Sequence, residues 1–293
     1  LKQLMVWDWK AESYILKEQS HVYDVTVSAM THDGSSIISG GDDGKIRVSK
    51  TSTGQCYVTF TEHSGGITGI ATSPATNAFF TSSKDGTCRA FDLVRYRNFR
   101  VFAVEPATQF SCLAVDPSGE ILVAGSLRKN AIYVFSVQTG KVVDELMGHE
   151  APIACLAFHP DGTTCISGAL DKNMIIWNMF TTTNQGERLR GDGEAVTMQS
   201  EVLAVAVSAN GRRMAVLSQN GEITVYDTIV PAEPVVIITF QTNHDATGGW
   251  SNTIGPNSSN SNMHFTTIDF SPDGEKIIAG GESKWLVMYH STQ

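Results

Sequence analysis

Short apolar runs recur along the chain, and most of them end in an aromatic residue followed by a polar one. The runs are Val6-Trp7-Asp8, Ala90-Phe91-Asp92, Val134-Phe135-Ser136, Ile176-Trp177-Asn178, Val225-Tyr226-Asp227 and Met288-Tyr289-His290, and Val48-Ser49 fits with Ser in the aromatic position. Successive aromatic positions lie 42, 42, 44, 42, 49 and 63 residues apart. This spacing predicts a structural repeat of about 42 residues that is interrupted by two insertions.

Asp-Gly-like pairs separate the apolar runs, and they predict tight turns between antiparallel strands. A first turn recurs at Asp33-Gly34, Ser118-Gly119, Asp161-Gly162, Asn210-Gly211 and Asp273-Gly274, and a second at Asp43-Gly44, Asp85-Gly86, Asp171-Lys172 and Asn220-Gly221. Asp or Asn before Gly supplies the positive φ that such turns require. A third turn, as at Gln138-Thr139-Gly140-Lys141, precedes one more apolar run. Each repeat therefore predicts four strands, and because no segment sustains a helical period we expect an all-β fold.

The landmarks of each unit resemble those of WD40 repeats. A His precedes the first strand at His21, His63 and Gly148-His149, an Asp lies in the turn before the third strand, and the third strand ends in a Trp-Asp-like pair. The resemblance implies a β-propeller, in which four-stranded antiparallel blades are arranged about a channel.

Counting strands on this basis predicts seven blades. A partial blade covers 3–18, five whole blades begin near residues 21, 63, 108, 149 and 200, and 264–290 form a last blade that lacks its outer strand. We therefore expect one WD40 propeller over 1–293, truncated at both seams and cut from a longer chain. The segment 241–263 is rich in Asn, Ser and Gly, so we expect a mobile loop there.

Composition narrows the function classes. The formal net charge of −9 argues against a generic basic nucleic-acid binder, and 41% apolar residues suffice for a large core. The five cysteines are odd in number and never spaced C-x-x-C, so we expect reduced thiols and no zinc site. No apolar run reaches the length of a membrane-spanning helix, and no nucleotide-binding or metalloprotease motif occurs. We therefore expect no cofactor, no metal and no membrane partner.

His149, Ser167 and Asp171 contain the residue types of a catalytic triad, and Trp177 completes a set that has a structural interpretation. WD40 repeats use these residue types as a buried hydrogen-bonded tetrad, and the separations within 167, 171 and 177 fit it. Partial copies recur as His21, Ser39 and Asp43 and as His63, Thr81, Asp85 and Phe91, whereas a catalytic triad occurs once and needs an oxyanion site. We therefore predict a structural tetrad and no enzyme. Ser49, Arg128 or Lys129, Asn220 and Ser283 depart from the pattern, so their blades should be less stable.

The stretch Arg95-Tyr96-Arg97-Asn98-Phe99-Arg100 is basic in an acidic chain. Strand alternation would place Tyr96, Asn98 and Arg100 on one face and Arg95, Arg97 and Phe99 on the other, at the accessible outer strand of a blade. One interpretation is a strand edge that charge protects from pairing. The other is contact with an acidic protein or with RNA phosphate, since Arg and aromatic residues together suit both. The candidate contact residues are Arg95, Tyr96, Arg97, Phe99 and Arg100.

A closer resemblance, specific over residues 3–150 and weaker over 179–263, is to the periodic tryptophan protein 2 family. It is carried by Val6-Trp7-Asp8-Trp9, Thr59-Phe60-Thr61-Glu62-His63, Ala90-Phe91-Asp92-Leu93-Val94-Arg95-Tyr96-Arg97 and Gln109-Phe110-Ser111-Cys112-Leu113. That family implies a nucleolar scaffold with two propellers and a helical C-terminal region, of which this chain would be the second propeller. The implied partners are other WD40 subunits of the UTP-B subcomplex of the small-subunit processome, pre-ribosomal RNA and a small nucleolar RNP.

Two function classes stay open at this point. The first is a non-enzymatic scaffold for processome assembly, early pre-rRNA processing and 40S ribosome biogenesis in the nucleolus. The alternative is a WD40 adaptor that recognises a peptide or modified peptide at the channel mouth. Such a reader would need a convergent cluster of Arg or aromatic residues on the loops at one mouth, and the sequence contains none that we can identify.

Overall fold

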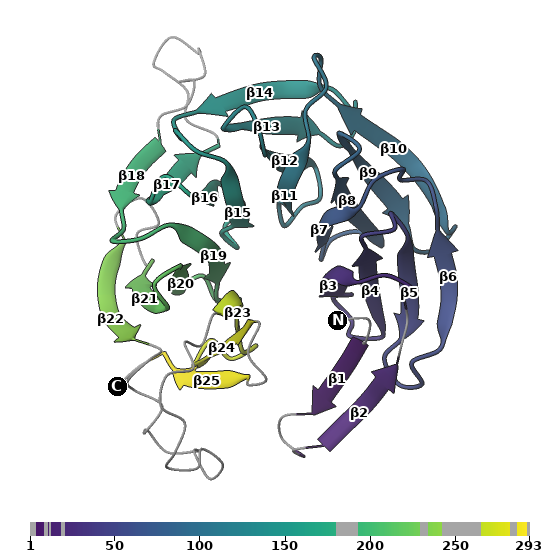
Figure 1. Ribbon diagram of the computed structural model, residues 1–293, viewed down its shortest axis with the longest axis horizontal. Coiled ribbons are helices and arrows are strands. Elements are labelled where there is room, and N and C mark those ends of the chain that lie inside the picture. The colour runs from purple at the N-terminus through teal and green to yellow at the C-terminus, as the bar shows by residue number, and fades with distance from the viewer. Residues whose placement is uncertain are drawn as a thin grey trace. The chain divides into compact units, whose positions relative to one another are not determined.

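The computed structural model (Figure 1) describes residues 4–8, 11, 13–18, 21–179, 193–228, 234–241, 265–281 and 286–291. These residues form β-strands joined by turns and bends, and no helix occurs among them. It follows that this part of the chain contains no helix long and apolar enough to cross a membrane. The predicted all-β fold of four-stranded antiparallel blades is confirmed.

The chain divides into two compact units, Leu1–Met147 and Gly148–Gln293. The first unit contains a two-stranded hairpin and three four-stranded sheets. The hairpin is β1 (Leu4–Asp8) and β2 (Ser13–Glu18). The first blade is β3 (Val25–Met30), β4 (Ser36–Gly41), β5 (Ile46–Lys50) and β6 (Cys56–Phe60). The second is β7 (Ile67–Thr72), β8 (Ala78–Ser83), β9 (Thr87–Asp92) and β10 (Arg97–Ala103). The third is β11 (Phe110–Val115), β12 (Ile121–Ser126), β13 (Ala131–Ser136) and β14 (Val142–Met147).

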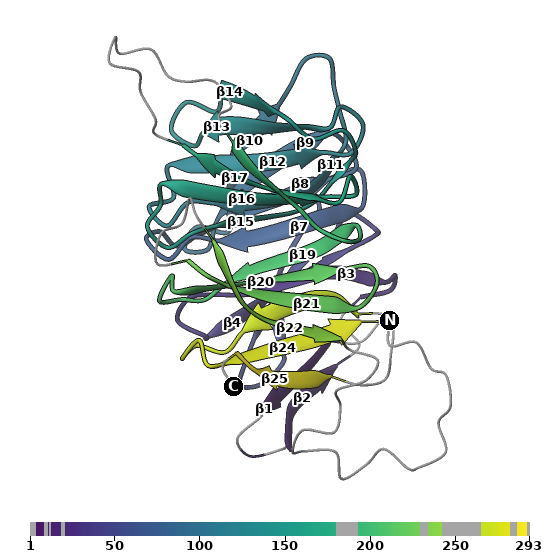
Figure 2. The same cartoon turned by 90° about the vertical axis from the view of Figure 1, so that its left-hand side faces the viewer.

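The second unit contains three sheets, which Figure 2 shows stacked on one another. The fourth blade is β15 (Ile153–Phe158), β16 (Thr164–Ala169), β17 (Asn173–Asn178) and β18 (Gly193–Thr197). The fifth is β19 (Val202–Val207), β20 (Arg213–Ser218), β21 (Glu222–Asp227) and β22 (Val235–Gln241). The sixth is β23 (Phe265–Phe270), β24 (Lys276–Gly281) and β25 (Val287–His290). Every sheet pairs its strands in chain order, so each blade is an antiparallel meander.

The prediction of seven blades is wrong. The described residues form six blades, five of four strands and one of three, and the N-terminal hairpin is a separate two-stranded sheet. Strand counting assigned one blade to each Trp-Asp-like landmark, and it therefore counted the hairpin, which carries Trp7-Asp8. Two strands that pair only with each other lack the inner strands that a blade buries. A Trp-Asp-like pair marks only the end of one strand. A blade also needs inner strands that pair with a neighbour on each side.

The position of a strand within its blade determines its burial. Every residue of β4, β8 and β16, each the second strand of a blade, is buried, whereas the fourth strand β10 alternates between exposed and less exposed residues. A strand covered on both faces must be apolar or small at every position, and an edge strand needs only one apolar face. Within the second blade, Phe91 stacks on Phe79 at a centroid distance of 5.0 Å, and its ring centroid lies 4.7 Å from that of Phe60 in the first blade.

Two segments of the predicted insertions fall outside the described residues, namely 180–192 and nearly all of the 241–263 stretch. Ser283 also lies outside them. None of the five cysteines, all of which lie within the described residues, forms a disulfide, and Cys88 and Cys165 are buried. The described residues contain no group of His, Cys, Asp and Glu that could hold a metal ion.

Candidate functional site

The fourth blade joins His149, Ser167, Asp171 and Trp177 in one chain of hydrogen bonds. The indole Nε1 of Trp177 donates to Oγ of Ser167 at 2.8 Å, and that oxygen lies 2.7 Å from Nε2 of His149. Nδ1 of His149 lies 2.8 Å from Oδ2 of Asp171. With the proton of His149 on Nδ1, the Ser167 hydroxyl donates to the free Nε2, so the four groups are connected without an unpaired donor.

This arrangement stabilises the blade and is unsuited to nucleophilic catalysis. Ser167 is fully buried, and its hydroxyl oxygen already receives the indole proton. Burial lowers the pKa of His149, although the neighbouring Asp171 opposes that shift. Burial would raise the pKa of Asp171, but hydrogen bonds from the backbone N–H groups of Asn173 and Glu150, together with the contact to His149, outweigh it and lower that pKa. A buried, satisfied network of this kind makes the surrounding structure rigid.

The second blade contains the same arrangement with two substitutions, Thr for Ser and Phe for Trp. Nε2 of His63 lies 2.8 Å from Oγ1 of Thr81, and Nδ1 lies 2.8 Å from Oδ2 of Asp85. Phe91 takes the place of the Trp, with its ring centroid 6.5 Å from that of His63. Phe supplies the apolar ring and no N–H donor, so this blade has a three-membered network beside an aromatic stack.

The first blade has the least complete of the three His-containing networks. Nε2 of His21 lies 2.8 Å from Oγ of Ser39, but Nδ1 is 3.9 Å from Oδ1 of Asp43, beyond hydrogen-bond distance. Ser49, in the Trp position, is buried, and its hydroxyl has no hydrogen-bond partner among the residues that the structure describes. The buried Nδ1 of His21 is also without one.

A related side-chain hydrogen bond in the third blade was not predicted from the sequence. Oγ1 of Thr108 lies 2.9 Å from Oγ of Ser126, and the backbone N–H of Lys129 donates to that same Oγ at 3.0 Å. Thr108 therefore occupies the position of the tetrad His. The signal was present in the spacing, because Thr108 and Ser126 are 18 residues apart, as are His149 and Ser167.

The basic stretch differs from its prediction in secondary structure. Strand β10 begins at Arg97, so Arg95 and Tyr96 lie in the turn before it, and Tyr96 has a positive φ of 50°. The turn forms because Oδ1 of Asp92 accepts the N–H groups of Val94 at 2.7 Å and of Arg95 at 3.1 Å. A β-bulge at residue 99 then shifts the pairing register of β10 with β9, but the expected alternation is kept, since Arg97 and Phe99 are exposed and Asn98 and Arg100 are only partly exposed.

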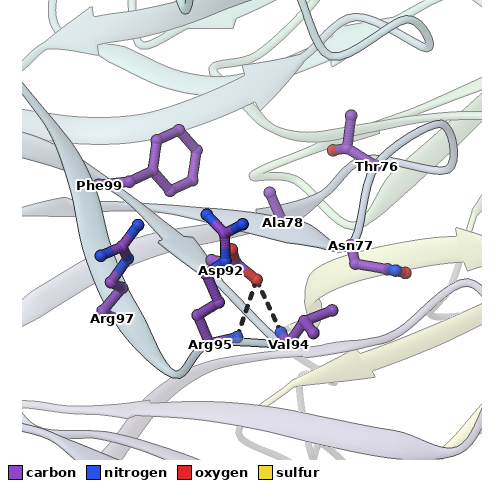
Figure 3. A pocket seen from close by; sticks show the side chains of 8 residues that line it. All are labelled: Thr76, Asn77, Ala78, Asp92, Val94, Arg95, Arg97 and Phe99. Atoms are coloured by element: carbon purple, nitrogen blue, oxygen red, sulfur yellow. Dashed lines mark hydrogen bonds between the residues drawn. The ribbon is translucent and has the colours of Figure 1, made fainter.

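These residues border an open depression of about 490 Å³ at the end of the second blade where the β7–β8 and β9–β10 turns lie. It extends to the rim of the blade, which is the edge formed by the fourth strand. It is lined by Thr76, Asn77, Ala78, Asp92, Val94, Arg95, Arg97 and Phe99. Figure 3 shows Phe99 and Arg97 on one side and Thr76 and Asn77 on the other, with Arg95 between them. We call this the rim depression.

The structure gathers three of the five candidate contact residues in the rim depression, namely Arg95, Arg97 and Phe99. Arg100 is only partly exposed, and its Nη2 donates to the backbone oxygen of Gln138 in the third blade at 2.7 Å. The ring of Tyr96 packs edge-on against Tyr57 of the first blade at 5.9 Å. These last two side chains therefore connect neighbouring blades.

The sequence interpretation missed the remaining lining residues. Thr76 and Asn77 lie in the turn between β7 and β8, and Ala78 begins β8. They lie close to the basic stretch only because the first and third turns of a four-stranded meander are at the same end of the sheet. Asp92 could have been found from the sequence, since an Asp two and three residues before a turn's N–H groups is a common turn-forming pattern.

Comparison with known proteins agrees with the repeat pattern. The family model described as WD domain, G-beta repeat, matches residues 13–48, 54–92 and 140–178. Over 100% of this chain, the periodic tryptophan protein 2 homolog of Dictyostelium discoideum is 43% identical. The homolog of Mus musculus is 42% identical over 98% of the chain, and periodic tryptophan protein 2 of Saccharomyces cerevisiae is 40% identical over 99%.

The blades, the His-Ser-Asp networks and the repeat match define a WD40-repeat protein. The resemblance to the periodic tryptophan protein 2 family is confirmed over nearly the whole chain, including the part where the sequence interpretation found it weak, and we place the chain in that family. The chain spans about a third of the length of these relatives, 31% of the Dictyostelium protein and 30% of the other two.

Proposed function

We propose that this chain is part of a non-enzymatic scaffold that assembles the small-subunit processome in the nucleolus. In this role it serves early pre-rRNA processing and 40S ribosome biogenesis. Its partners are other WD40 subunits of the UTP-B subcomplex, pre-ribosomal RNA and a small nucleolar RNP, contacted directly or through those subunits. The observation that carries the proposal is the match to periodic tryptophan protein 2 along nearly the whole chain.

The geometry supports a scaffold better than it supports an enzyme. The most complete set of catalytic residue types, His149, Ser167 and Asp171, is buried in a hydrogen-bonded network. An incomplete copy of that network in the second blade indicates a repeated structural element, because an active site occurs once. The exposed arginines and apolar side chains at the rim of the second blade are suited to binding a partner.

The rim depression is the surface that we assign to partner contact. Neither Arg95 nor Arg97 forms a salt bridge in the part of the chain that the structure describes. Phe99 is 42% exposed beside them. Arg and aromatic residues are enriched where proteins bind partners, because each combines a large contact area with directional interactions.

The proposal is tested by purifying the protein, tagged at its own genomic locus, from growing cells. We expect early pre-ribosomal RNA and several WD40 subunits in the purified material, measured by RNA hybridisation and mass spectrometry. A tagged WD40 protein from outside the nucleolus is the matched control. Recovery of neither pre-ribosomal RNA nor WD40 subunits above that control would overturn the proposal.

A further inference from the structure

We propose that the rim depression binds an acidic segment of a partner protein that carries one apolar anchor residue. The anchor packs against Phe99 and Val94, and carboxylates before or after it pair with Arg95 and Arg97. This inference rests on the proposed function only for where in the cell the partner is bound. The chemistry of the partner is inferred from the residues of the depression.

The two arginines are positioned for carboxylates. Arg95 and Arg97 are both exposed and form no salt bridge among the described residues, so both guanidinium groups are accessible to an incoming carboxylate. Guanidinium groups bind carboxylates through two parallel hydrogen bonds, which adds geometric selectivity. Arg95 lies in the turn before β10 and Arg97 is the first residue of that strand, so two carboxylates close together in one segment can reach both.

An apolar anchor is indicated by the exposed hydrophobic surface. Phe99 is 42% exposed and Val94 is 65% exposed, and both line the depression. Phe99 is the bulged residue of β10, and its counterparts in β6 and β14, Tyr57 and Val143, are exposed as well. An apolar residue at the bulge is therefore common to the three rims of the first unit. The pair of arginines beside it is what distinguishes the second blade.

A protein segment fits the depression better than RNA does. RNA binding draws on several phosphate contacts, and the depression offers two arginines, Arg95 and Arg97. Asp92 also lines the depression, and its backbone hydrogen bonds and the two nearby arginines lower its pKa, so it stays ionised and offsets one of the two positive charges. The single net positive charge that remains is too little for several phosphate contacts. The exposed apolar area of Val94 and Phe99 matches an aliphatic or aromatic side chain.

The bulge also determines how the segment is held. β10 is the outermost strand of its sheet, and the bulge at Phe99 interrupts the regular spacing of its backbone groups. Bulges of this kind disfavour the addition of a further strand. Binding therefore depends on side chains, and it should respond to side-chain substitutions in the depression.

The first experiment measures binding by the full-length protein to fluorescent ten-residue peptides. The probe peptide has Glu residues around a single Leu, and the comparison probes replace Leu by Ser, replace every Glu by Lys, or are a ten-nucleotide oligouridylate. We expect binding of the Glu-Leu peptide alone. R95E/R97E should weaken it about tenfold or more, which corresponds to about 1.4 kcal/mol. The matched control R128E/K129E makes the same charge change in an exposed turn of the third blade and should leave the affinity unchanged.

Two further variants separate binding from folding. Asp92→Asn keeps an oxygen that can accept the N–H groups of Val94 and Arg95, but it removes a negative charge from the depression, so it should strengthen binding of the acidic peptide a few-fold. Phe99→Ala should weaken that binding, whereas Val143→Ala, at the bulge of the third rim, should not. A structural role for these residues would produce no gain of affinity in Asp92→Asn.

The outcomes also distinguish this inference from the proposed function. If pre-ribosomal RNA and WD40 subunits co-purify equally with R95E/R97E and wild type, and peptide affinity is unchanged, the inference is overturned and the scaffold function stands. If the peptide binds as expected but no pre-ribosomal RNA or WD40 subunits are recovered with the wild type, the scaffold function fails and the inference stands. Binding of oligouridylate that R95E/R97E abolishes, without peptide binding, would also overturn the inference and identify an RNA site.

Discussion

The indole Nε1 of Trp177 donates a hydrogen bond of 2.8 Å to the hydroxyl oxygen of Ser167, its neighbour on the adjacent strand β16. The carboxylate of Asp171, whose pKa is lowered, accepts the Nδ1 proton of His149, so Nε2 of His149 accepts the hydroxyl proton of Ser167. The indole can only donate and the carboxylate can only accept, so these two groups fix the direction of the network from its two ends.

Replacing Asp171 by Ala should lower the free energy of unfolding by about 1–3 kcal/mol, because it leaves buried donors of the network without an acceptor. The lost partners are Nδ1 of His149 and the N–H groups of Glu150 and Asn173. Asn220→Ala in the fifth blade should cost less, since Asn220 is exposed and its hydrogen bonds go to Glu222 in its own turn. Urea midpoints of the two variants test this, and the opposite ranking would contradict the structural role.

Trp177→Phe should cost about 1 kcal/mol, and Trp177→Ala about 3–5 kcal/mol. The Phe variant keeps most of the buried ring and loses only the donor to Ser167. The second blade already uses Phe91 in this position, next to its own His63. Equal losses for the two variants in urea unfolding would show that the hydrogen bond, and not ring burial, dominates this site.

Acidification should destabilise the protein below the ordinary His pKa of 6.5. Burial lowers the pKa of His149 and of His21, so in this range the unfolded chain binds protons that the folded chain does not. Stability is therefore complete above about pH 7 and decreases as the pH falls towards the lowered values. Carboxylates such as Asp171, whose pKa is also lowered, lose their contribution only below about pH 4.

The measurement is the urea midpoint at about pH 7.5 and about pH 5.5, where these carboxylates stay ionised. In His149→Asn the difference between the two midpoints should be smaller than in the wild type, because one buried titrating group is gone. An unchanged difference in that variant would assign the pH dependence to other groups.

Gly44→Ala should destabilise the protein more than Gly34→Ala does. Both glycines have positive φ, 75° and 68°, so each substitution costs about 1 kcal/mol in backbone strain. At Gly44 the new Cβ would lie 2.7 Å from the backbone oxygen of His63, whereas at Gly34 the nearest atom is Sδ of Met30 at 3.9 Å. We expect a total of about 3 kcal/mol or more for Gly44→Ala. Thermal unfolding of the two variants compares them directly.

Local patterns along the chain predicted most of the secondary structure correctly. The Asp-Gly pairs form turns with positive φ at Gly34, Gly44, Gly86, Gly162 and Gly274. These features could be recognised because turn chemistry depends on two to four consecutive residues. The constant separation of 18 residues between His149 and Ser167 likewise follows from the number of residues in one hairpin, so spacing was enough to group the members of the network.

Contacts between blades, in contrast, were not visible in the sequence. Alternation grouped Arg100 with Tyr96 and Asn98, but its bond to Gln138 connects residues 38 positions apart in two blades. The turn that Asp92 stabilises positions Arg95, and the bulge at Phe99 positions that side chain, so both line the depression and Arg100 does not.

By itself the sequence determined the strand pattern, the turns and the residues of the buried networks, because each depends on a repeat of short-range chemistry. Only the tertiary structure decided that the hairpin β1–β2 is a sheet of its own, and therefore that six blades exist among the described residues. It also decided that Arg95, Arg97 and Phe99 meet Thr76 and Asn77 at one rim. The physical reason is that strand pairing and rim contacts join segments far apart in the chain, and local spacing carries no information about which of them pair.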